Sequence, residues 1–114
     1  MKVIVDAFGG DNAPVEILKG SALAAEELSV QITLVGNKAE IKKAAEENNI
    51  DISSMDIVES GSIITAFDSP MTVIKSKQDS SMAVGLSLLA DGRGDAFVSA
   101  GSTGALVVGG TFIV

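Results

Sequence analysis

The sequence KVIVDAFGGDNAP, residues 2–14, sets out a strand, a glycine-rich loop and the start of a helix. Its first part, Lys2 to Asp6, is a short β-branched run of the kind that forms a buried strand. Pro14 suits the first turn of a helix, where its missing N–H costs nothing. We therefore expect the chain to begin with a strand, a loop and a helix.

The same order of elements recurs in the next part of the chain. Gln31 to Val35 predicts a second strand that ends at Gly36. Asn37, with Glu40 three residues later, resembles a capping box, which predicts a helix to about residue 48. Residues 56–59 predict a third, weaker strand.

Two further elements complete the pattern. Residues 79–81 can cap a helix that ends at residues 91–92, residues 95–99 predict a fourth strand, and a last helix begins at residue 105. Strands that alternate with helices indicate an α/β domain with right-handed crossovers. We expect residues 1–114 to form the N-terminal part of a single α/β domain with a doubly wound, mostly parallel, Rossmann-like sheet.

Composition supports this class and limits the chemistry. The residues are 46% apolar but only 4% aromatic, which suits aliphatic strands covered on both faces. A net charge of −7 argues against nucleic-acid binding. Without cysteine or histidine, any chemistry must use backbone amides, hydroxyls, carboxylates or lysines.

The two ends of the chain also carry expectations. Met1 and Lys2 lead directly into the first strand, which leaves no signal-peptide pattern and predicts a cytoplasmic protein. The most apolar stretch, residues 105–114, is too short to cross a membrane. It is apolar nearly all round and lacks a stop signal, so we expect a truncated chain.

The turn after the fourth strand is a candidate anion site, because ligands of open parallel sheets lie beyond the carboxyl ends of the strands. Gly101 and Gly104 allow close backbone approach, and the amides of the following helix would point at an anion. Ser102 and Thr103 add hydroxyl donors. The alternative is that these glycines only make a tight turn.

The loop after the first strand is the second candidate. It offers Gly9, Gly10, Asp11 and Asn12, without the spacing of a dinucleotide fingerprint or a Walker loop. The alternative is that Asp6 and Asn12 only tie the loop and cap the helix.

A third candidate precedes the third helix. Lys75 and Lys77, followed by Ser80, suit a phosphate or an acidic partner in a chain otherwise poor in positive charge. The alternative is a solvated loop.

Three segments, at residues 5–14, 77–82 and 95–106, resemble signatures of the PlsX-type phosphate acyltransferases. That family is similar in fold to phosphotransacetylases and isopropylmalate dehydrogenases, and its proteins are much longer. The resemblance implies transfer of a fatty acyl group from acyl carrier protein to inorganic phosphate, giving acyl phosphate for phospholipid synthesis. It implies a homodimer with no metal and no cofactor, and peripheral membrane association is left open.

The resemblance also implies roles. Gly101 to Gly104 would supply donors to phosphate or to the developing oxyanion, with Ser102, Asp11 and Asn12 as the catalytic candidates. Gly9, Gly10 and Ser80 would help to bind phosphate, and Lys75 or Lys77 would balance its charge. The chain departs from the family where Phe8 replaces Met, Ser102 replaces Asn, and Lys75-Ser76 replaces a more basic pair.

Because the chain is acidic, we expect the carrier protein to dock mainly on sequence beyond residue 114, and residues 1–114 to be inactive alone. Two alternatives remain: a short-chain, acetyl-phosphate-forming acyltransferase, and a non-catalytic phosphate-binding module. The main proposal requires residues 9–12 and 101–104 to lie at the same end of the sheet.

Overall fold

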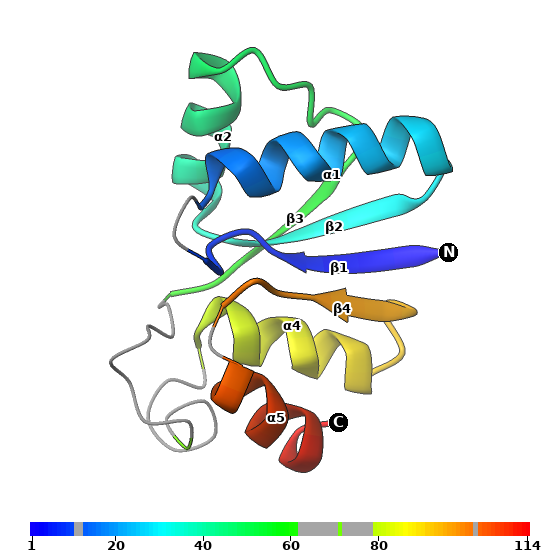
Figure 1. The fold of residues 1–114 in the computed structure, drawn as a ribbon, viewed down its shortest axis with the longest axis vertical. Coiled ribbons are helices and arrows are strands. Elements are labelled where there is room, and N and C mark those ends of the chain that lie inside the picture. Colours follow the sequence, from blue (N-terminus) through cyan, green and yellow to red (C-terminus); the bar gives the residue numbers. More distant parts are fainter. Residues whose placement is uncertain (11–12, 62–70, 72–78, 102) are drawn as a thin grey trace.

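The computed structural model describes residues 1–10, 13–61, 71, 79–101 and 103–114 (Figure 1). Strands and helices alternate as the sequence predicts. The elements are β1 (Lys2–Asp6), α1 (Val15–Leu28), β2 (Gln31–Gly36), α2 (Lys38–Glu47), β3 (Asp56–Glu59), α4 (Ser81–Ala90), β4 (Ala96–Val98) and α5 (Thr103–Phe112).

The four strands form one sheet in the order β3-β2-β1-β4. All neighbouring strands are parallel, and Val5 of β1 pairs with Leu34 of β2 on one side and Val98 of β4 on the other. The sheet grows from β1 in one direction through β2 and β3, and in the other direction to β4. The strand order therefore reverses between β1 and β4, which is where ligands of such sheets bind.

Helices cover both faces of the sheet, as expected for a doubly wound fold (Figure 1). On one face Val5 and Leu34 pack with Leu18 of α1 and Ile41 of α2. On the other face Ile4 and Val35 pack with Leu88 of α4. Alpha-helix α5 packs on α4, where Ala105 joins Met82 and Leu86. The reversal of strand order explains this division, because right-handed crossovers in opposite directions place their helices on opposite faces.

Local signals account for the helix starts. The Asn37 side chain accepts a 3.0 Å hydrogen bond from the Glu40 amide, which confirms the predicted start of α2. The Ser80 hydroxyl accepts a 3.1 Å bond from the Ala83 amide and caps α4. Each cap satisfies one of the amides that the first turn of a helix leaves unpaired.

Among the described residues, no helix combines the length and apolar character needed to span a membrane.

Candidate functional site

The two glycine-rich turns touch each other at the carboxyl ends of β1 and β4. A Cβ atom on Gly9 would lie 2.8 Å from Ser99 Oγ and 2.9 Å from the Gly101 nitrogen. A Cβ atom on Gly10, whose φ is +94°, would lie 3.2 Å from the Ala100 Cβ. Only glycine at position 9 permits this approach. The described parts of both turns therefore lie at the same end of the sheet, as the main proposal requires.

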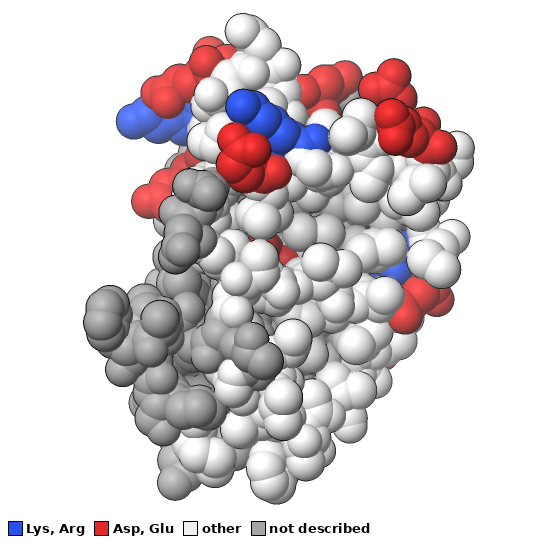
Figure 2. Space-filling view, in the orientation of Figure 1, with Lys and Arg blue, Asp and Glu red and all other residues white. Residues whose placement is uncertain are grey.

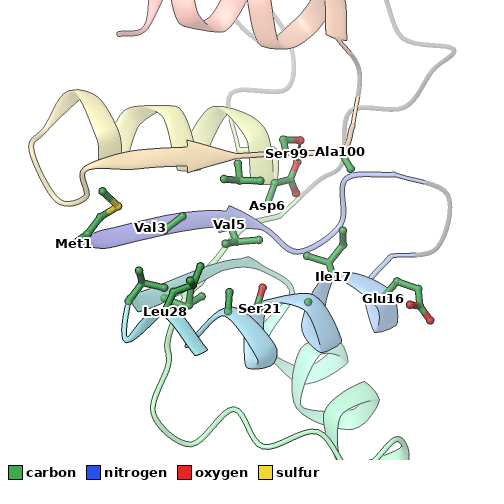
Figure 3. Close-up of a pocket in the computed structure, with 15 residues that line it drawn as sticks. Met1, Val3, Val5, Asp6, Glu16, Ile17, Ser21, Leu28, Ser99 and Ala100 are labelled. Atoms are coloured by element: carbon green, nitrogen blue, oxygen red, sulfur yellow. Dashed lines mark hydrogen bonds between the residues drawn. The ribbon is translucent and has the colours of Figure 1, made fainter. Parts of the chain in front are cut away.

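The Asp6 carboxylate, at the end of β1, joins three segments. Its Oδ1 accepts hydrogen bonds from Ser81 Oγ at 2.6 Å and from the Phe8 amide at 3.1 Å. Its Oδ2 accepts a 2.9 Å bond from Ser99 Oγ (Figure 3). The residue is only 3% exposed, and no Lys or Arg of the described ranges pairs with it. Within the described part of the chain, hydroxyl and amide donors therefore satisfy this buried carboxylate.

The chain of hydrogen bonds continues into the second turn. The Gly101 amide donates to Ser99 Oγ at 3.1 Å, so it already has a partner inside the turn. The start of α5, at Thr103 and Gly104, follows two residues later. The amides of a helix's first turn lack intrahelical acceptors and favour anions. We therefore expect the amides that bind an anion to lie in the first turn of α5, and not at Gly101.

The structure brings some of the predicted site residues together. Gly9 lies against Gly101 and Gly10 against Ala100, and Gly104 follows in the first turn of α5. Ser80 is fully buried, and its hydroxyl serves as the cap of α4. A direct role in phosphate binding stays a prediction for each of these residues.

The other predicted site residues lie outside the described residues: Asp11, Asn12, Lys75, Lys77 and Ser102. The side chain of Thr103 is likewise not described, although its backbone begins α5. Their roles also stay predictions.

Sequence reasoning missed Ser81 and Ser99 as parts of this site. It assigned Ser81 to a helix cap and Ser99 to a strand end, and it gave Asp6 only a local loop role. A signal was available, since both serines stand beside predicted strand exits or helix starts, where a buried carboxylate finds donors. The partners of Asp6 lie 75 and 93 residues away, so the pairing itself could not be inferred.

An apolar groove of about 460 Å³ runs from these turns along β1 and α1 (Figure 3). Ser99 and Ala100 line one end, and Met1 and Leu28 line the other. Val98 contributes to the groove and is 54% exposed. The groove exists because α4 and α5 both pack on the opposite face, so that no described helix covers this side of β4.

Charged side chains gather over α1 and α2 (Figure 2). The acidic excess lies in α1, which has three glutamates and one lysine, whereas α2 has three of each. Below them the described surface in this view is largely uncharged. The face seen in Figure 2 therefore offers no described basic patch to an acidic partner.

Comparison with known proteins extends the resemblance to the whole chain. A family model described as "Fatty acid synthesis protein" matches residues 1–114. Proteins named phosphate acyltransferase are 41% identical in Clostridioides difficile and 46% identical in Thermotoga neapolitana, each over all of this chain. The chain covers 34% and 32% of those two proteins, so it spans about a third of their length. The chain thus belongs to the fatty acid synthesis protein family, and its likeness to the PlsX-type phosphate acyltransferases runs from residue 1 to residue 114.

Proposed function

We propose that residues 1–114 form the N-terminal part of an enzyme that transfers a fatty acyl group from acyl carrier protein to inorganic phosphate. The product would be acyl phosphate for phospholipid synthesis. The observation that carries the proposal is the contact between Gly9 and the Ser99–Gly101 turn at the reversal of strand order. The relatives' name, phosphate acyltransferase, supplies the reaction class.

The reaction suits the groups found at this edge of the sheet. A phosphate oxygen attacks the thioester carbonyl, the new O–C bond forms, the C–S bond breaks, and the carrier leaves as a thiol after taking up a proton. The main requirements are to hold phosphate near the carbonyl carbon and to stabilise the tetrahedral oxyanion. The start of α5 suits the first requirement, because a helix N-terminus attracts anions.

The remaining roles follow the resemblance. Asp11, Asn12 and Ser102 orient the reactants, and Lys75 or Lys77 offsets the charge of phosphate. We expect carrier protein, itself acidic, to dock mainly on sequence beyond residue 114, since residues 1–114 carry a net charge of −7. The whole protein would act in the cytoplasm as a homodimer, and residues 1–114 alone would be inactive.

The test is an assay of the full-length protein that contains this chain, with palmitoyl carrier protein and inorganic phosphate as substrates. Acyl phosphate is the expected product, and acetyl donors should be turned over far more slowly. The Gly9→Ala variant should lose most activity, because its Cβ would meet Ser99 and Gly101. Gly20→Ala is the matched control, since a Cβ at Gly20 meets nothing within 4 Å. Preference for acetyl donors would instead support a short-chain, acetyl-phosphate-forming acyltransferase. Phosphate binding without turnover would support a non-catalytic phosphate-binding module.

A further inference from the structure

Asp6 occupies the centre of the candidate site, yet the proposed chemistry gives it no task. Its two oxygens accept three hydrogen bonds, from the first loop, from α4 and from the residue after β4. Asp6 borders the apolar groove, but hydrogen bonds occupy both of its oxygens and the residue is only 3% exposed. It therefore offers little surface to a substrate, and its influence on the reaction passes mainly through its partners.

One of its partners leads directly to the anion site. Ser99 Oγ carries a single hydrogen, which it donates to Asp6 Oδ2. This fixes the hydroxyl so that its lone pairs remain free to accept the hydrogen of the Gly101 amide. Without the carboxylate, the hydroxyl could rotate and lose this arrangement. Asp6 thus controls the shape of the turn that precedes α5.

The other partner provides an internal comparison. Ser81 Oγ donates to the second oxygen of the same carboxylate and ties it to α4. Among the described residues, the Ser81 hydroxyl bonds to Asp6 and not to residues 99–101, and Ser81 belongs to the buried start of a different helix. Loss of the Ser81 hydroxyl should therefore lower the stability of the chain without disturbing the hydrogen bond of the Gly101 amide.

We propose that Asp6 is a positioning residue that acts through Ser99 to hold the Gly101 amide, and thereby sets the affinity of the α5 start for phosphate. The inference rests on the proposed function for the identity of the anion. It assigns a purpose to a buried carboxylate that hydrogen bonds satisfy at both oxygens.

The experiment compares Asp6→Asn, Ser99→Ala and Ser81→Ala with the unmodified chain, residues 1–114. Inorganic phosphate is titrated while amide NMR signals are followed, and the exchange rate of the Gly101 amide hydrogen is measured without phosphate. Ser99→Ala and Asp6→Asn should each weaken phosphate binding about tenfold, the scale of one lost hydrogen bond. Both should speed exchange at Gly101. Ser81→Ala should leave both values near those of the unmodified chain.

Equal weakening of phosphate binding by Ser81→Ala and Ser99→Ala would overturn the inference, because the carboxylate would then serve only stability. If Asp6→Asn does not fold, the comparison of Ser99→Ala with Ser81→Ala still tests the inference, since each of these variants keeps the carboxylate and removes one of its two hydroxyl partners. Failure of the unmodified chain to bind phosphate would count against the proposed function instead. In that case the exchange rate of the Gly101 amide hydrogen in Ser99→Ala decides whether Ser99 holds this amide. An unchanged rate would reject that role, and a faster rate would support it.

Discussion

Gly9 and Ser99 lie so close that a Cβ atom on residue 9 would stand 2.8 Å from the Ser99 hydroxyl oxygen. The same atom would be 2.9 Å from the Gly101 nitrogen and 3.0 Å from Asp6 Oδ2. Such distances are well inside van der Waals contact, and two hydrogen bonds join all three neighbouring atoms to one another. The loop after β1 and the turn after β4 thus fit each other only because residue 9 has no side chain.

Gly9→Ala should therefore destabilise the chain. Relief of the overlap must push the two turns apart, and overpacking of this kind costs about 1–3 kcal/mol. Urea unfolding followed by circular dichroism measures the change in the free energy of unfolding. Gly20→Ala, on an exposed part of α1 with open space around it, should be neutral or stabilise by up to about 1 kcal/mol. Equal stability of the two variants would show that the turns do not meet as described.

Gly85 makes a second close approach, where α4 lies against the ring of Phe97 in β4. Gly85→Ala should destabilise, again by about 1–3 kcal/mol, because the added methyl overlaps the ring. Phe97→Leu alone should also destabilise, through lost apolar contacts. In the double variant the smaller Leu makes room for the methyl, so the combined loss of unfolding free energy should be less than the sum. Strict additivity would contradict this packing.

Ser80→Ala separates a structural role from a binding role. Its hydroxyl caps α4 by accepting from the Ala83 amide, and Ser80 is fully buried. Loss of the cap should cost about 1–2 kcal/mol of unfolding free energy. Asn37→Ala, which removes the exposed cap of α2, is the matched control and should cost about 0.5–1 kcal/mol. If Ser80 also binds phosphate, phosphate affinity should fall in Ser80→Ala and not in Asn37→Ala, as a titration would show.

The face of β4 that no described helix covers should make residues 1–114 bind apolar probes. Val98 is 54% exposed in the groove beside Val3 and Val5, and contiguous apolar surface of this kind attracts apolar ligands. Val98→Ser should lower the fluorescence of a bound naphthalene sulfonate dye. Val107→Ser, at a valine of α5 that is 63% exposed outside the groove, should change the signal less. A larger effect at Val107 would place the apolar binding surface on α5.

Much of the fold follows from local signals in the sequence. The strand bounds Lys2–Asp6 and Asp56–Glu59 agree with the prediction, because short apolar runs stand between polar or glycine-containing loops. The Asn37 and Ser80 caps mark two helix starts through contacts within three residues. The parallel, doubly wound sheet follows from the alternation of elements and the handedness of their crossovers.

The candidate site was only partly predictable, for a physical reason. Strand order decides which turns meet, and the contact of Gly9 with Ser99 spans most of the chain. The hydrogen bonds of Asp6 to Ser81 and Ser99 join residues that no local pattern relates. The same holds for the groove beside Val98, which depends on the face chosen by α4 and α5.

The central claim is that the turns following β1 and β4 together hold inorganic phosphate. Its most direct measurement is a map of backbone amide shifts in residues 1–114 as phosphate is added, with chloride at equal ionic strength as the reference. The account predicts that the largest shifts fall at Gly9 and Gly10 in the loop after β1 and at Gly104 in the first turn of α5. Shifts spread evenly over the surface, or centred on the lysines of α2, would contradict it.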